Sequence, residues 1–192
     1  MNILLIVDPQ YDFIDGTLPV PGAREGMDRL AKALPDMSID HIIITMDAHT
    51  IAHCSFKAQG GLWPAHCVKY SPGAAIDSNL FEAVATRVSK HHTPITYIEK
   101  ATSQDRDEYS AFTTSYPRIM DNADIIYVAG IAGDVCVHTS VGDLVRQGLG
   151  EKMCVVTDAC PSLDGGEKLS ASSRNQGYNK PLRHHCHSII NY

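Results

Sequence analysis

Residues 127–141 read YVAGIAGDVCVHTSV, and this stretch predicts a buried strand, a tight turn and a helix. It begins apolar, breaks at Gly130, and then continues with apolar or small residues spaced along one helix face: Val137, Val141, Leu144, Val145 and Gly148. The pattern places Cys136 in the first turn of that helix, where unpaired N–H groups and the helix dipole favour a thiolate. The stretch alone is equally consistent with a buried, unreactive cysteine.

Similar apolar runs alternate with helical patterns along the rest of the chain. Strands are expected over residues 3–7, 41–46, 94–98, 125–129 and 153–156, with a sixth over 186–190. Helices are expected over residues 24–34, 80–88, 119–122, 137–148 and 167–175, and residues 12–22, 50–79 and 101–117 are expected to be loops. This alternation predicts an α/β fold with an open, mostly parallel, six-stranded sheet and helices on both faces, of Rossmann-like type, in a single domain over residues 1–192.

Composition excludes several classes of function. The 192 residues include 16 basic and 22 acidic side chains, a net charge of −6, with no basic run that would favour nucleic acid as a partner. No apolar stretch approaches the roughly 18 residues that a membrane span needs, and residues 1–8 do not resemble a signal peptide. The six cysteines do not suggest a disulfide scaffold, so a cytoplasmic protein is expected.

Polar side chains follow several of the expected strands. Asp8, Asp47, Lys100 and the Cys136 turn all lie at carboxyl ends, the edge where parallel α/β sheets bind ligands. An acid, a lysine and a cysteine can form a nucleophilic triad in which Asp8 accepts the thiol proton and Lys100 stabilises the thiolate. Backbone N–H groups of Ala132 and Cys136 are candidates for an oxyanion hole. The alternative is a structural Asp–Lys ion pair beside an inert core cysteine.

Candidate metal ligands and a candidate ring-binding wall lie in the loops. The ligand candidates are Asp47, His49 and His66, with His53 as an additional candidate. Imidazole and carboxylate groups suit zinc, iron or manganese. A structural zinc site that uses Cys54 and Cys67 remains an alternative, and residues 184–187 are expected to be a solvated end rather than a second metal site. Phe13, Trp63 and Tyr109 are candidates to wall a slot for a flat ring, unless each is simply packing.

These motifs together resemble the isochorismatase-like cysteine hydrolases, and within them the nicotinamidase/pyrazinamidase group. The matching pieces run in family order over residues 2–160: residues 6–13 (IVDPQYDF), 47–49 (DAH), 53–56 (HCSF), 63–67 (WPAHC), Lys100, 130–137 (GIAGDVCV) and 157–159 (TDA). The resemblance implies the isochorismatase-like hydrolase fold. It departs from the family at Ala48, where an aromatic residue is common, and at Gly133, where a small hydroxyl residue is usual.

The resemblance also implies a reaction. Cys136 would attack the carboxamide of nicotinamide to form a thioester and release ammonia, water would then release nicotinate, and Asp8 would shuttle the proton. One divalent metal ion, with zinc favoured over iron or manganese, would bind the pyridine nitrogen and order water. Its ligands would be Asp47, His49 and His66, with His53 a ligand in some members.

Further implications concern the pocket and the biological context. Substrate would contact Phe13, Trp63, Tyr109, Ala132 and Val135, and a cis peptide bond would precede Ala132. A homo-oligomer that acts in NAD salvage and also accepts pyrazinamide is expected. The alternatives are a hydrolase of another small amide, a ureido compound or isochorismate, and a non-catalytic binding domain on the same fold.

Overall fold

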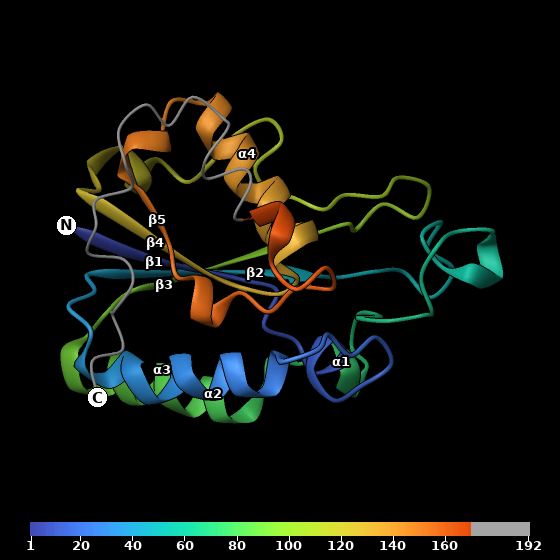
Figure 1. The fold of residues 1–192 in the computed structure, drawn as a ribbon, viewed down its shortest axis with the longest axis horizontal. Helices are drawn as coiled ribbons and strands as arrows, with labels where there is room; N and C mark the ends of the chain where they lie inside the picture. The colour runs from blue at the N-terminus through green and yellow to red at the C-terminus, as the bar shows by residue number, and fades with distance from the viewer. Residues whose placement is uncertain (170–192) are drawn as a thin grey trace.

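A five-stranded parallel sheet, with strands in the order β3-β2-β1-β4-β5, lies at the centre of the computed structural model, which describes residues 1–169 (Figure 1). The strands are β1 (Asn2–Val7), β2 (His41–Asp47), β3 (Ile95–Lys100), β4 (Ile125–Gly130) and β5 (Met153–Val155). All four neighbouring pairs are parallel, so the predicted sheet type is confirmed. The sixth strand predicted over residues 186–190 lies outside the described residues.

Helices cover both faces of this sheet, with α2 and α3 on one side and α4 on the other (Figure 1). The helices are α1 (Tyr11–Ile14), α2 (Ala23–Ala33), α3 (Ser78–His91) and α4 (His138–Arg146). A π-helical turn, η5 (Gly133–Val137), leads directly into α4. Short 3-10 turns are η1 (Leu34–Asp36), η2 (Lys57–Gln59), η3 (Pro72–Ala74), η4 (Arg118–Asn122), η6 (Gly150–Lys152) and η7 (Thr157–Ala159). Of the helix expected over 167–175, the described residues 167–169 are helical.

The sequence prediction missed helix α1 and the start of helix α3. Residues 12–22 were expected to be a loop, but α1 makes one helical turn there, which ends where the N–H groups of Asp15 and Gly16 both donate to Tyr11 O at 3.0 Å. Helix α3 begins at Ser78, two residues early, because the Asp77 carboxylate accepts a hydrogen bond from Leu80 N at 3.2 Å and caps the helix.

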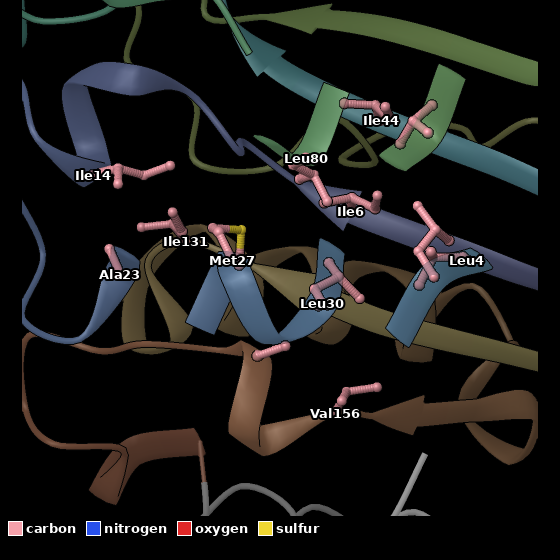
Figure 2. Close-up of a cluster of buried hydrophobic side chains, with 14 of the residues drawn as sticks. Leu4, Ile6, Ile14, Ala23, Met27, Leu30, Ile44, Leu80, Ile131 and Val156 are labelled. Atoms are coloured by element: carbon pink, nitrogen blue, oxygen red, sulfur yellow. The ribbon is translucent and has the colours of Figure 1, made fainter. Parts of the chain in front are cut away.

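Strand β1 separates two hydrophobic clusters. Leu4 and Ile6 face α2 and α3, where they meet Met27 and Leu30 (Figure 2). The other β1 side chains, Ile3, Leu5 and Val7, belong to the cluster on the α4 side. Because both faces of β1 are covered, its sequence is an unbroken apolar run rather than an alternating one.

The order in which strands are added reverses between β1 and β4. Strands β2 and β3 lie on one side of β1, and β4 and β5 lie on the other. The carboxyl ends of β1 and β4 therefore flank the topological switch point, where open α/β sheets bind ligands. Gly130 ends β4 with a φ of 134°, and a Cβ there would overlap Val7 O, so the close approach of the two strands requires glycine.

The described residues show the apolar character of the helices and the state of the cysteines. Within residues 1–169, no helix has both the length and the apolar character needed to cross a bilayer. Cys54, Cys67, Cys136 and Cys160 are free thiols.

Candidate active site

The predicted acid, lysine and cysteine meet at the switch point. Asp8 directly follows β1, Lys100 is the last residue of β3, and Cys136 lies in η5. Lys100 Nζ lies 2.9 Å from Asp8 Oδ2 and 3.6 Å from Cys136 Sγ. Thr45 Oγ1 donates to Asp8 Oδ1 at 2.7 Å and orients the carboxyl group. All three reactive side chains are at least 95% buried, so the site forms a charged centre within the core.

Burial shifts the pKa values of the groups in this centre. It raises the pKa of the Cys136 thiol well above its ordinary value, and the neighbouring Lys100 ammonium only partly opposes that effect. Burial likewise raises the pKa of Asp8 more than Lys100 lowers it. Desolvation therefore opposes the thiolate that the helix dipole and the lysine are expected to favour. Asp8, Asp47 and Cys136 each offer one atom in a group that spans at most 4.8 Å, so the Asp8 carboxyl group lies close enough to take the thiol proton.

The turn between β4 and α4 positions the nucleophile. Cys136 lies in the π-helical turn, two residues before the start of α4, rather than in the first turn of that helix. The N–H groups of Val135 and Val137 both donate to Ala132 O at 3.1 Å. The peptide bond that precedes Ala132 is cis, as the resemblance implied. Gly133 N donates to Pro161 O at 2.8 Å, which ties the turn to the chain beyond β5.

The structure also brings together the three predicted metal ligands. Asp47, His49 and His66 each offer one atom in a group that spans at most 4.8 Å, and all three side chains are buried. The Nε2 atoms of His49 and His66 lie 3.3 Å apart, and Asp47 Oδ2 lies 3.5 Å from His49 Nε2. His66 Nδ1 lies 2.8 Å from Pro64 O, a donor position that leaves its Nε2 lone pair facing the group.

Charge and protonation in this group suit a divalent cation. Burial lowers the pKa of His66, so its ring is neutral near pH 7 and can act as a ligand. Burial alone would raise the pKa of Asp47, but Lys100 and His49 hold it below its usual value. Lys100 binds Asp47 Oδ1, so the other carboxylate oxygen remains for a metal. One lysine thus contacts both Asp8, the candidate catalytic acid, and Asp47, a candidate metal ligand.

His53 lies beside the ligand group but makes different contacts. Its ring centroid is 4.2 Å from that of His49. Its Nδ1 lies 2.8 Å from Ser55 Oγ, and its Nε2 lies 3.2 Å from Arg106 O. Both ring nitrogens of this fourth candidate are therefore engaged elsewhere, and the described group contains three ligands.

A pocket of about 430 Å³, including its open mouth, lies over these groups. Its lining residues are Phe13, Leu18, Val20, Asp47, His49, Trp63, His66, Asp107, Glu108, Tyr109, Ala132, Val135, Cys136 and Leu163. All five predicted substrate contacts are among them, and Trp63 Nε1 donates to Tyr109 OH at 3.3 Å across the aromatic wall. Sequence reasoning missed Leu18, Val20, Asp107, Glu108 and Leu163, which lie in segments without a recognisable motif.

Comparisons with known proteins agree with this geometry. The isochorismatase domain model matches residues 2–178. A nicotinamidase/pyrazinamidase of Mycobacterium tuberculosis is 31% identical, over 85% of this chain and 89% of the relative, and a nicotinamidase of Saccharomyces cerevisiae is 28% identical, over 82% and 87%. The zinc complex of the Pyrococcus horikoshii pyrazinamidase superposes with a TM-score of 0.73 at 25% identity, covering 92% of this chain and 96% of that one. The chain belongs to the isochorismatase family, and these relatives place it beside the nicotinamidases and pyrazinamidases.

Proposed function

We propose that this protein is a metal-dependent amidase that hydrolyses nicotinamide to nicotinate and ammonia through a cysteine thioester, with pyrazinamide as a second substrate. One observation carries the proposal: a single pocket holds Cys136, three candidate metal ligands and an aromatic wall that suits a flat ring. The nicotinamidase and pyrazinamidase relatives, and a nicotinate complex of the L. infantum protein PnC1 (26% identity, TM-score 0.73), support this substrate class. Such an activity would serve NAD salvage.

The acid and the cysteine perform the bond changes in this proposal. Cys136 Sγ attacks the carboxamide carbon while Asp8 takes the thiol proton, and the N–H groups of Ala132 and Cys136 stabilise the oxyanion. Asp8 passes the proton to the amide nitrogen, the C–N bond breaks, and ammonia leaves a thioester. Water then attacks the thioester carbon, and its proton returns through Asp8 to the sulfur as nicotinate leaves. Lys100 keeps its positive charge throughout, because Asp47 and Asp8 raise its pKa despite burial.

The metal-ligand group fits one divalent ion. The Nε2 atoms of His49 and His66 converge at 3.3 Å, and a carboxylate oxygen of Asp47 lies beside them. Asp47, His49 and His66 would hold the ion, with zinc favoured and iron or manganese as alternatives. When bound, it supplies a positive charge that can bind the substrate's ring nitrogen.

The charge of the pocket distinguishes the substrate alternatives. Three acidic side chains, Asp47, Asp107 and Glu108, line the pocket, and no lysine or arginine among residues 1–169 does so. Lys100 lies beneath the pocket floor and already contacts Asp8 and Asp47. A neutral amide meets no charge repulsion here, whereas isochorismate would bring two carboxylates toward this acidic lining, in which Asp47 and Glu108 are already paired with Lys100 and Arg106. The pocket therefore favours a neutral carboxamide.

Ammonia release tests the proposal directly. Metal-replete protein should release ammonia from nicotinamide and pyrazinamide, chelation should stop release, and added zinc, iron or manganese should restore it. Cys136→Ala should abolish turnover and leave metal content unchanged. Cys54→Ala, at a free cysteine outside the pocket, should retain turnover. If metal-replete protein released no ammonia from either amide, the proposal would fail in favour of another small amide, a ureido compound or a non-catalytic domain.

A further inference from the structure

Two buried polar side chains near the site have no role in the mechanism above. Gln10 is fully buried and Asp12 is 5% exposed, and both follow Asp8 closely in the chain. Neither lines the pocket, and neither belongs to the metal-ligand group. A buried carboxylate and a buried amide are costly unless they are hydrogen-bonded, so their partners indicate what they do.

Gln10 holds the backbone of Asp47. Its Oε1 accepts a hydrogen bond from Asp47 N at 2.8 Å, and its Nε2 donates to Asp47 O at 2.8 Å. The same Nε2 donates to Ala74 O at 2.9 Å, and Gln10 N donates to Asp8 O at 2.8 Å. The Gln10 side chain therefore hydrogen-bonds to both the N–H and the carbonyl of Asp47, a candidate metal ligand. The Gln10 backbone N–H links the same segment to Asp8, the proposed proton acceptor.

Asp12 holds the backbone at Cys67, which follows His66 and hydrogen-bonds to His49. Its Oδ2 accepts a hydrogen bond from Cys67 N at 2.7 Å, directly after His66. Cys67 has a φ of 45°, a left-handed conformation, and its carbonyl accepts from His49 N at 3.1 Å. The carboxylate thus acts on His66 through the chain and on His49 through one further hydrogen bond.

The surroundings leave Asp12 little freedom to move. Its Oδ1 accepts a hydrogen bond from Thr17 N at 3.1 Å. A Cβ at Gly73 would overlap the carboxylate, as would one at Gly16, so glycines enclose it on two sides. The position of this carboxylate is therefore set by the core rather than by solvent.

We propose that Gln10 and Asp12 are positioning residues that pre-organise Asp47, His49 and His66 for a divalent ion. The inference rests on the metal-binding part of the proposed function. Loss of a hydrogen bond that orients metal ligands costs roughly 10–100-fold in affinity. We expect Gln10→Met and Asp12→Ala to raise the zinc dissociation constant by about that factor. Asp12→Asn should have a smaller effect, because its amide oxygen can still accept one of the two hydrogen bonds.

Zinc binding to metal-free protein tests this directly, measured by competition with a chromophoric chelator. Alkylation of Cys136 serves as a metal-independent readout and should proceed at the wild-type rate in the variants. Asp77→Asn is the matched control: Asp77 is a buried carboxylate that accepts a hydrogen bond from Leu80 N and pairs with Arg24, away from the ligands. It should lower stability and leave zinc affinity unchanged.

Two results would overturn the inference. One is zinc affinity within twofold of wild type in folded Gln10→Met and Asp12→Asn proteins, which keeps the test decisive if Asp12→Ala fails to fold. The other is an equal loss of affinity in Asp77→Asn, which would indicate general destabilisation. If wild-type protein bound no zinc, iron or manganese, the metal part of the proposed function would fail as well, whereas ammonia release tests the activity separately.

Discussion

Replacement of Gly133 by alanine tests how tightly the catalytic turn is packed. A Cβ at this position would overlap Ser162 Oγ and lie 2.7 Å from Cys160 O, where ordinary contact begins near 3.4 Å. One of these atoms is a side-chain hydroxyl and the other is backbone, so only the first can move cheaply. Overpacking of this kind costs about 1–3 kcal/mol, and we expect Gly133→Ala to lower the free energy of unfolding by that amount.

A double-mutant cycle with Ser162→Ala separates the two overlaps. Ser162→Ala alone should cost about 0.5–1.5 kcal/mol, because its hydroxyl donates to Cys160 O at 3.2 Å. With the hydroxyl removed, Gly133→Ala should cost less, since only the backbone overlap remains. We expect a coupling of about 0.5–1.5 kcal/mol, which makes the double variant more stable than the sum of the single effects predicts.

Urea unfolding of the four proteins, followed by circular dichroism, measures this coupling. The slopes with urea should agree, so that differences in midpoint report stability alone. Ammonia release from nicotinamide should fall more steeply than stability in Gly133→Ala, because the turn carries Cys136. Additivity within about 0.5 kcal/mol would refute the packing argument.

Three further predictions concern the reactive groups. Because burial raises the pKa of Cys136, its alkylation should be slow at pH 8 and rise about tenfold per pH unit above that, as mapped by mass spectrometry; a plateau below pH 9 would contradict the assignment. Asp8→Asn should lower the rate of ammonia release by about 10²–10⁴-fold with zinc content retained, and wild-type turnover would exclude Asp8 as the proton carrier. Zinc at 100 times its dissociation constant should raise the free energy of unfolding by about 2.7 kcal/mol, as measured by thermal unfolding. The same zinc concentration should not stabilise His66→Ala, which lacks one candidate ligand.

The sheet and the meeting of the reactive groups could be predicted from sequence. Strands β1 and β4 appear as apolar runs because other elements cover both of their faces. Parallel strands bring their carboxyl ends to one edge, so Asp8, Lys100 and the Cys136 turn were expected to meet there, as the structure shows. Regular geometry of the backbone was enough for that prediction.

The features that the sequence did not predict depend on contacts between distant segments. The raised pKa of Cys136 follows from burial by neighbours far along the chain, which its local helix pattern does not encode. Helical periodicity starts at Val137, so it could not reveal that a π-helical turn comes first. The acidic rim of the pocket, Asp107 and Glu108, lies in an aperiodic loop whose position depends on the folded core.

The pairing of β2 with β3 has a consequence for folding. Asp47 lies directly opposite Lys100 at the last position of their shared register. If β3 slipped by one residue, Glu99 would face Asp47, and like charges directly opposite each other destabilise a strand pair. The groups assigned to chemistry therefore also penalise misaligned pairing, so that a chain with the wrong β2–β3 register would lose stability as well as its active site.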